Sequence, residues 1–433
     1  MRIFFSVGEP SGDLHGANLI RALRERRPDV ECVGYGGPLM AEAGAKLHFD
    51  LTALAVMWIL RVILNIHKFL GLLARADRSF RDERPDAVVL IDYPGFNWWI
   101  ARRAKARGIP VFYYTPPQIW GWARWRVKKM KKFVDHVLCS LPFEEAWFRD
   151  KGCNATFIGH PYFDEVRRQQ LDQRFLDWHA AGATGPLVTL LPGSRTQEVE
   201  LNLPTFLRAA QEIRARVPRA RFAIAAFREH QAEWARELIS SMGLDTPVYV
   251  GRTPELIQQS TCCIACSGSV SLELLHHRKP TVIGYRVSKF GYFLQNYFRQ
   301  VPYITLVNLL STGRLERDRA AEARGESPLA DPRVLFPEFL APEDRSVEIG
   351  AQITEWLTNV EAKEHVVAGL NRLYAEVGDG GASARGADYI LAVVAPTDAA
   401  ARAVESPIAA PHYLHPATTK GTISERSRTE RAR

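Results

Sequence analysis

The feature that most constrains the fold is a stretch in which two apolar runs flank a segment with helical periodicity. Residues 262–266 and 281–285 are apolar runs of the length of buried strands, and apolar side chains between them recur at helical spacing. A turn of small residues, Ser267-Gly-Ser269, separates the first run from the helical pattern. The stretch therefore predicts a strand–loop–helix–strand unit of a parallel sheet, with the loop at the start of the helix.

The same turn is a candidate anion site. Backbone N–H groups at the start of a helix have no partner within the helix, and the helix dipole favours negative charge there. Glu273 follows on the first turns of this helix, where a carboxylate can accept hydrogen bonds from two sugar hydroxyls. We interpret the turn as a candidate diphosphate site and Glu273 as a candidate ribose ligand. An ordinary loop with a solvated glutamate is the alternative that this stretch leaves open.

The alternation of strands and helices runs through both halves of the chain and predicts two Rossmann-like α/β domains with a cleft between them. The predicted strands are 3–7, 86–91, 110–114, 136–140 and 155–158 in the first half, and 187–191, 222–226, 248–250, 262–266 and 281–285 in the second. The predicted divisions are 1–164, 165–358, C-terminal helices in 359–395 and a disordered tail in 396–433. We expect at least one C-terminal helix to pack back on the first domain.

Composition excludes several classes of protein. A hydrophobic content of 46% and a charged content of 24% are typical of a globular chain rather than a disordered or fibrous one. The six cysteines lie mostly inside apolar runs, and no second Cys or His pair stands at ligand spacing, so we expect reduced, buried thiols in a cytosolic protein and no zinc site. Residues 1–7 are typical of a strand and not of a secretory signal.

The net charge of +8 is unevenly distributed, because residues 1–164 hold 24 Lys and Arg against 17 Asp and Glu. A basic first half indicates an anionic partner, which can be a phosphorylated substrate, an acidic membrane surface or a nucleic acid. In residues 115–132, aromatic and basic side chains alternate in a way that suits nucleobases as well as a membrane interface. Arg124, Arg126 and Lys128 are candidates for a phosphate or headgroup, with a solvated face as the alternative.

Residues 56–73 form the most apolar stretch of the chain. Arg61, Asn65 and Lys68 interrupt it at spacings of four and three, so they share one helix face, and their charge argues against a transmembrane span. The pattern favours a helix that lies on a bilayer, with an internal amphipathic helix as the alternative. The side chains expected to enter the bilayer are Trp58, Ile59, Ile63, Ile66 and Leu70.

Two loops of the first half carry polar groups to the carboxyl edge of the predicted sheet. The turn Gly8-Glu-Pro-Ser-Gly-Asp13 follows the first strand and lacks the spacing of a dinucleotide motif. It brings Glu9 and Ser11 to the edge where doubly wound folds bind ligands, with helix capping as the alternative for Ser11. Asp92 follows the strand at 86–91 and projects from the same edge, where a general base belongs.

Arg195 is the candidate for charge neutralisation. It follows the strand at 187–191 and the turn residues Gly193 and Ser194, at the start of an amphipathic helix. Together with the Ser267-Gly-Ser269 turn it can neutralise a diphosphate without a cation. The chain has no Asp-x-Asp motif that would hold a metal ion for this purpose, so we expect no metal and no other cofactor.

Taken in order, these motifs resemble those of the lipid-A-disaccharide synthase family over residues 1–395. They are Gly8-Glu-Pro-Ser-Gly-Asp13, Ile91-Asp-Tyr-Pro-Gly-Phe-Asn97, Leu141-Pro-Phe-Glu144, Phe157-Ile-Gly-His160, Leu191-Pro-Gly-Ser-Arg195, Ser267-Gly268 with Glu273, Gly284-Tyr-Arg286 and Leu306-Val-Asn-Leu-Leu310. The resemblance implies the GT-B fold and an inverting glycosyltransferase. This activity joins UDP-2,3-diacylglucosamine to 2,3-diacylglucosamine 1-phosphate (lipid X), forms the β-1,6 disaccharide of lipid A and releases UDP.

The resemblance also implies roles for single residues and for partners. Asp92 and Arg195 match residues that the family requires. The residues expected to bind substrate are Glu9, Ser11, Asn97, Gly193, Ser194, Ser267, Gly268, Ser269, Glu273, Tyr285 and Asn308. The resemblance implies peripheral attachment to the cytoplasmic side of the inner membrane. It also implies a homodimer that exchanges its C-terminal helices. We expect no nucleic-acid partner.

The chain departs from the family pattern in three places. Gly95 stands where many members have a second Asp, so Asp92 is expected to act alone as the base. Residues 311–332 look like an insertion, and the tail from 396 onwards has no counterpart.

Two other functions compete with this one. Another UDP-sugar enzyme of the same architecture, such as a 2-epimerase or a different GlcNAc transferase, would share the nucleotide site but would need no apolar acceptor surface. Turnover of UDP-GlcNAc without a lipid acceptor would favour it. A non-enzymatic RNA- or membrane-binding protein would use residues 120–132, and steeply salt-dependent binding without affinity for UDP would favour that.

Overall fold

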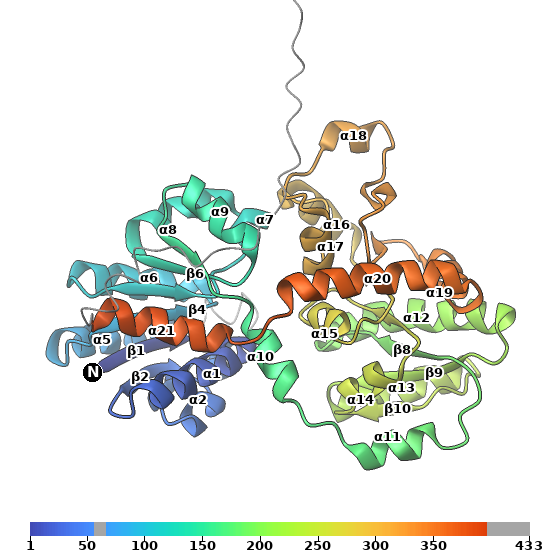
Figure 1. Ribbon diagram of the computed structural model, residues 1–433, viewed down its shortest axis with the longest axis horizontal. Helices are drawn as coiled ribbons and strands as arrows, with labels where there is room; N and C mark the ends of the chain where they lie inside the picture. Colours follow the sequence, from blue (N-terminus) through green and yellow to red (C-terminus); the bar gives the residue numbers. More distant parts are fainter. Residues whose placement is uncertain (56–65, 396–433) are drawn as a thin grey trace, which may run out of the picture.

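The computed structural model describes residues 1–55 and 66–395, which form two α/β units around two parallel sheets (Figure 1). The first sheet has the strand order β3-β2-β1-β4-β5-β6-β7, and the second has the order β10-β9-β8-β11-β12-β13. In each sheet the order reverses beside its first strand, between β1 and β4 and between β8 and β11. Open α/β sheets bind their ligands at such switch points, outside the carboxyl ends of the strands.

The first unit comes from the N-terminal part of the chain. Its strands are β1 (Arg2–Val7), β2 (Glu31–Gly36), β3 (Lys46–Asp50), β4 (Ala87–Ile91), β5 (Val111–Tyr114), β6 (His136–Cys139) and β7 (Ala155–Phe157). Its helices are α1 (Pro10–Arg26), α2 (Pro38–Glu42), α3 (Thr52–Ala55), α5 (Ile66–Asp82), α6 (Pro94–Ala106), α7 (Ile119–Trp122), the 3-10 turn η1 (Arg124–Arg126), α8 (Val127–Phe133) and α9 (Pro142–Asp150).

The second unit follows the connecting helices α10 (Pro161–Arg168) and α11 (Gln173–Ala180). Its strands are β8 (Leu187–Leu191), β9 (Arg221–Ala226), β10 (Val248–Val250), β11 (Cys262–Ala265), β12 (Thr281–Arg286) and β13 (Glu338–Ala341). Its helices are α12 (Thr196–Arg216), α13 (Glu229–Ser241), α14 (Thr253–Gln259), α15 (Val270–His276), α16 (Lys289–Phe298), α17 (Leu306–Thr312), α18 (Arg319–Ala323), η2 (Pro328–Ala330), α19 (Ser346–Thr358) and α20 (Val360–Val377), and α21 (Ala382–Val394) ends the described chain.

The ten predicted strands are present, and three further strands, β2, β3 and β13, lack the long apolar runs on which the prediction depended. In β2 the apolar run is interrupted by a glycine for a steric reason. Gly34 has φ +128°, and a Cβ there would lie 2.2 Å from the backbone oxygen of Phe5 on the neighbouring strand. A glycine is therefore required inside a buried strand, although glycine is otherwise rare in strands.

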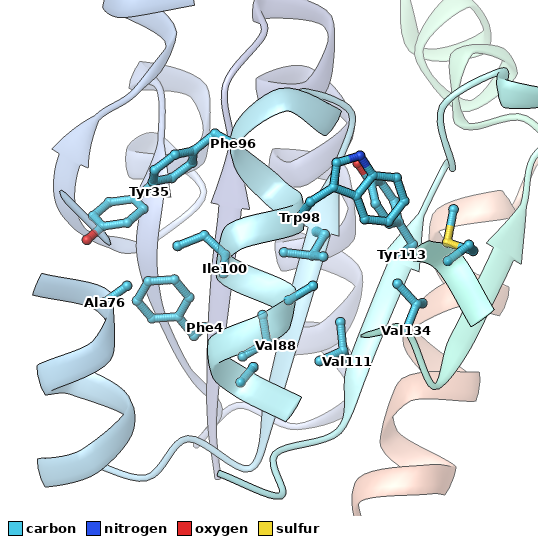
Figure 2. Close-up of a cluster of buried hydrophobic side chains, with 14 of the residues drawn as sticks. Phe4, Tyr35, Ala76, Val88, Phe96, Trp98, Ile100, Val111, Tyr113 and Val134 are labelled. Atoms are coloured by element: carbon cyan, nitrogen blue, oxygen red, sulfur yellow. The ribbon is translucent and has the colours of Figure 1, made fainter. Parts of the chain in front are cut away.

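The core of the first unit fills both faces of its sheet because successive strand residues point to opposite sides. Phe4 and Val88 pack against α5 and α6 with Trp98 and Ile100 (Figure 2). The ring of Trp98 lies 5.7 Å from that of Tyr113, between the centroids. Burying one such side chain stabilises the fold by about 1.5–3 kcal/mol, so this layer holds β1, β4 and β5 in place.

The C-terminal helices divide between the two units (Figure 1). Leu370 and Leu373 of α20 are buried in the core of the second unit, whereas Ala387 and Ile390 of α21 are buried against α1 and β1 of the first. Asp164 of α10 caps α21, because its carboxylate accepts a 2.8 Å hydrogen bond from the N–H of Ser383 and further bonds from the two preceding amides. The expected return of a C-terminal helix to the first unit is confirmed.

The predicted bilayer helix falls partly outside the described residues. Trp58, Ile59 and Ile63 lie there, while Ile66 and Leu70 are exposed on the first turns of α5. No helix within 1–55 or 66–395 is long and apolar enough to cross a membrane. All six cysteines lie in the described residues as buried thiols.

Candidate active site

Asp92 lies in a strained turn at the carboxyl end of β4. Asp92 and Tyr93 have φ values of +46° and +44°, a left-handed conformation that costs a non-glycine residue about 1–2 kcal/mol. Together with Thr115, at the end of β5, they account for three of the five non-glycine residues with positive φ in the described chain. Such strain is found at functional sites, where the surrounding structure holds it in place.

Asn97 and Tyr113 hold this turn. The side-chain amide of Asn97 donates to the backbone oxygen of Asp92 at 2.8 Å, and the hydroxyl of Tyr113 donates to the same oxygen at 2.7 Å. Asn97 also donates to the backbone oxygen of Ser6 and accepts a 2.7 Å bond from its hydroxyl, so it ties the end of β1 to the end of β4. These bonds fix the backbone from which the Asp92 carboxylate projects.

The electrostatic environment of Asp92 suits a proton acceptor at neutral pH. The residue is half-buried, and burial of its carboxyl group, together with the negative charges of Glu9 and Glu144, raises its pKa to about 7. A general base is most effective when its pKa lies near the working pH.

Glu9 and Ser11 lie at the start of α1, beside Asp92. Glu9 is half-buried at the N-cap position, and burial raises its pKa while the charge of Arg195 opposes the shift. Ser11 is exposed on the first turn of α1. Glu9 belongs to the first unit and Arg195 to the second, so charges carried by loops of the two units lie close enough to influence each other.

The loop after β8 presents Gly193, Ser194 and Arg195. Gly193 has φ +136°, and a Cβ there would lie 2.6 Å from the Cβ of Glu198, so only glycine fits. Asn202, buried in α12, donates to the backbone oxygen of Pro192 at 3.0 Å and accepts from the N–H of Arg286. This loop is therefore tied to β12 much as Asn97 ties the Asp92 turn to β1.

Arg195 is held only loosely. Its side chain is 79% exposed and pairs with Glu198 at 3.0 Å, three residues further along α12. An exposed ion pair of this kind stabilises a protein by about 0–1 kcal/mol, so a diphosphate can replace Glu198 at little cost. The hydroxyl of Tyr285 donates to the same Glu198 oxygen at 3.3 Å, which holds the glutamate when the arginine moves.

Glu273 offers one free oxygen to the pocket. The side chain is only 6% exposed, and its Oε2 accepts a 3.0 Å hydrogen bond from the hydroxyl of Tyr162 in α10. Its Oε1 is buried and has no hydrogen-bond partner in the described part of the chain. Burial raises the pKa of Glu273. A buried acceptor without a partner is costly, so Oε1 is poised to accept from a ligand hydroxyl.

Arg195 and Glu273 border a pocket of about 500 Å³ in the second unit, whereas Asp92, Glu9 and Ser11 do not line it. Of the predicted residues, Gly193, Ser194, Arg195, Ser267, Gly268, Ser269 and Glu273 line it. Sequence reasoning missed Tyr162, Gln169, Glu198, Phe227, Gly251, Thr253, Pro254 and Val270, which also line it. Phe227 and Gly251 directly follow β9 and β10, so the carboxyl-edge rule could have found them, whereas nothing local in the sequence points to Tyr162.

Asn97, Asn308 and Tyr285 do not line this pocket. Asn308 is fully buried, where its carbonyl oxygen accepts from the N–H groups of Leu335 and Phe336 and its amide donates to Glu338 at 2.8 Å. The amides of both asparagines are engaged within the protein, so the geometry favours a positioning role over the predicted substrate contact. Their contact with substrate stays a prediction.

No group of three or more His, Cys, Asp and Glu side chains that could hold a metal ion occurs in the residues for which the structure is described.

Comparisons with known proteins point to one family. Residues 3–326 match a family model described as lipid-A-disaccharide synthetase. A lipid-A-disaccharide synthase of Myxococcus xanthus is 33% identical over 396 residues, which cover 91% of this chain and 98% of the relative. Another, of Thiobacillus denitrificans, is 34% identical over 405 residues, which cover 92% of this chain and all of the relative.

Solved structures with the same fold are more distant in sequence. A UDP-GlcNAc 2-epimerase from Neisseria meningitidis, bound to UDP-GlcNAc, aligns over 90% of this chain and 100% of its own with a TM-score of 0.60 and 12% identity. The calicheamicin glycosyltransferase aligns over 91% of this chain and 99% of its own with a TM-score of 0.54 and 14% identity. These neighbours confirm the predicted GT-B arrangement of two Rossmann-like units.

Proposed function

The chain belongs to the lipid-A-disaccharide synthase family, and from this membership and the geometry of the cleft we propose an inverting transfer from UDP-2,3-diacylglucosamine to 2,3-diacylglucosamine 1-phosphate. The chain is thus a glycosyltransferase of lipid A biosynthesis, and the resemblance found in its motifs is confirmed. The finer proposal is carried by exposed Arg195 and the free oxygen of Glu273 in the second unit, and by the Asp92 carboxyl group of the first unit, whose pKa is about 7.

The UDP moiety of the donor is assigned to the pocket of the second unit. The exposed backbone of Gly268 and Ser269 can donate N–H groups to the diphosphate, and the free oxygen of Glu273 can accept from a ribose hydroxyl. The exposed ring of Phe227 lies in the same pocket, and aromatic rings stack on bases with about 1–3 kcal/mol per base. We therefore place the uracil on the side of Phe227.

Asp92 is assigned the role of general base. In its ionised form it takes the proton from the 6-hydroxyl of the acceptor as that oxygen attacks the anomeric carbon of the donor. The bond between this carbon and the diphosphate oxygen breaks, and UDP leaves with the electron pair. The oxygen enters opposite the leaving group, so the α-linked donor gives a β-linked product. A positioned base contributes about 10²–10⁴-fold to such a rate.

Arg195 is assigned the role of stabilising the negative charge that develops on the leaving group. It exchanges Glu198 for the diphosphate as negative charge builds on UDP, and the N–H groups near Gly268 share that charge. Both kinds of donor belong to the protein, so we expect the reaction to proceed in EDTA.

The lipid substrates imply contact with an anionic bilayer on the cytoplasmic side of the inner membrane. Exposed Ile66 and Leu70 at the start of α5 support this contact in the described residues. We also propose a homodimer that exchanges α21, because the link between α20 and α21 contains Gly378, Gly380 and Gly381 and can redirect the helix to a second copy.

Release of UDP tests the proposal. Purified full-length protein in detergent with EDTA is incubated with UDP-2,3-diacylglucosamine, with and without the 1-phosphate acceptor. We expect release that depends on the acceptor and continues in EDTA, with the product's β-linkage read by NMR from the anomeric coupling. Bound UDP without acceptor-dependent release would mean that the acceptor is wrongly assigned, and loss of release in EDTA would refute the metal-independent scheme.

A further inference from the structure

The largest unexplained feature of the surface is the aromatic face of α16. All side chains of this helix are at least partly exposed with respect to the described part of the chain. Phe290, Phe293 and Tyr297 are 73%, 67% and 63% exposed, and Leu294 is also exposed. Their spacing of three and four residues places these four side chains on one face of the helix. A contiguous exposed apolar face of this kind is typical of a surface that binds a membrane or another protein.

Basic side chains lie at both ends of this aromatic face. The nearby acidic side chain of Glu322 is paired with Arg317, which also donates to the backbone oxygen of Asn296 in α16. Lys289 begins α16 and is exposed, and exposed Arg319 of α18 donates to the backbone oxygen of Tyr297 at 2.8 Å. A binding partner of this surface must therefore accommodate aromatic rings and carry negative charge.

The face continues onto the first unit. The N–H of Gln300, just after α16, donates to the backbone oxygen of Gly121 in α7 at 2.9 Å, and Arg124 donates to the backbone oxygen of Leu315. Figure 1 shows α7 and α16 on the sides of the two units that face each other. Trp122 of α7 and Trp125 of η1 are exposed, and exposed lysines follow them on α8.

Topology brings these segments to the cleft. The helices α7 and α16 directly follow β5 and β12 and begin at the carboxyl edges of their sheets. Helix α5 ends just before β4, at the amino edge, so its first turns lie toward the carboxyl edge. Exposed Ile66 and Leu70, at the start of α5, belong to the same edge as the tryptophans of α7 and η1.

We propose that the aromatic face of α16, continued by Trp122 and Trp125, docks on the surface of an anionic lipid bilayer. Aromatic side chains favour the interfacial layer of a membrane, and each basic residue near an anionic surface adds to the attraction. The inference rests on the proposed membrane attachment and extends it to the second unit, so that the cleft opens onto the bilayer from both sides. A second copy of this chain is disfavoured as the occupant, because a symmetric contact would bring two basic faces together.

Vesicle flotation tests the inference. Full-length protein is mixed with phosphatidylcholine vesicles with and without 30% phosphatidylglycerol, at low and high NaCl. The test variant carries Phe290→Gln, Phe293→Gln and Tyr297→Gln, which leave the core untouched because none of the three is buried. The matched control carries Trp178→Gln, Val347→Gln and Val360→Gln, three exposed apolar residues on α11, α19 and α20. A third variant, Ile66→Gln with Leu70→Gln, tests α5 separately.

We expect the anionic vesicles to bind the wild type and the control equally, and the α16 variant at least about tenfold more weakly. UDP binding of the α16 variant should be unchanged, which shows that the second unit is folded. If the α16 variant binds vesicles as the wild type does, the inference fails while membrane attachment stands; if the wild type does not bind, both fail. Light scattering completes the test, because an α16 variant that loses a dimer and keeps vesicle binding would assign the face to a second copy.

Discussion

The loops that carry the candidate site residues are built differently in the two units. The first unit places Asp92 on a strained left-handed turn, beside the carboxylate of Glu9 and above a network of buried hydrogen bonds. The second unit uses glycine at Gly193 and a turn around Gly268, and leaves Arg195 exposed and loosely paired. One side is therefore organised to hold a proton acceptor in one geometry, and the other to receive an anion with little strain.

The largest effect on turnover is expected from replacing the proposed base. Asp92→Asn should lower kcat at least about 100-fold and leave the Kd for UDP unchanged, because the amide cannot take a proton. In the wild type, kcat should rise with pH through about 7, as Asp92 ionises. Asp29→Asn, an exposed substitution, is the control. Near-normal turnover of the Asp92 variant would remove Asp92 from this role.

Removing the arginine should act on the other side. Arg195→Ala should weaken UDP binding about 10- to 100-fold, measured by calorimetry, because a charge-assisted contact to the diphosphate is lost. Arg345→Ala is a matched control, since Arg345 also stands at the N-cap of a helix and pairs with the glutamate three residues on. Unchanged affinity for UDP would contradict the assignment of Arg195.

The buried asparagines Asn97 and Asn202 test whether the two sides of the site act separately. Asn97→Ala should reduce kcat about tenfold with little effect on UDP affinity, because the turn carrying Asp92 loses its support. Asn202→Ala should instead weaken UDP binding by a similar factor, because the Gly193 loop is released. Thermal melts identify any variant that has lost its fold. Identical effects of the two substitutions would mean that the two sides are not functionally separate.

A smaller effect is expected from the hydroxyl that orients Glu273. Tyr162→Phe should raise the Kd for UDP about three- to fivefold, because the carboxylate loses its 3.0 Å hydrogen bond and its fixed orientation. Tyr374→Phe serves as the control, since that hydroxyl bonds His276 away from the pocket. Equal shifts in the two variants would point to a general loss of stability.

The smallest effect concerns stability. The pKa of Asp92 lies near 7 in the folded protein and near 3.8 when unfolded, so the folded state binds the proton more tightly. The free energy of unfolding therefore decreases as pH rises from about 4 to 7. Asp92→Asn lacks this loss, and its Tm should exceed that of the wild type by a few degrees at pH 8 and match it at pH 4. A constant difference across this range would show that ionisation is not the cause.

The likeness to 2-epimerases is one of fold alone, at 12% identity. It shows how widely this arrangement of two sheets is used, and the site residues carry the functional argument.

The sequence by itself determined the two α/β units, most strands, the family and the pocket residues of the turns at Gly193 and Ser267. These are local properties, because an apolar run followed by a glycine turn and a helix needs no distant partner to be recognised. Sequence reasoning missed β2, where glycines break the apolar pattern although its neighbours in the sheet bury it, and β13, a short, half-buried edge strand.

Only the tertiary structure decided which predicted residues meet. Asn97 and Asn308 were expected to bind substrate, yet their amides are used inside the protein, while Tyr162 reaches Glu273 from 111 residues away. The raised pKa of Asp92 likewise depends on burial and on the charges of Glu9, at the start of α1, and Glu144, in α9. Burial and charge are sums over neighbours in space, and the order of residues along the chain does not contain them until the sheets are assembled.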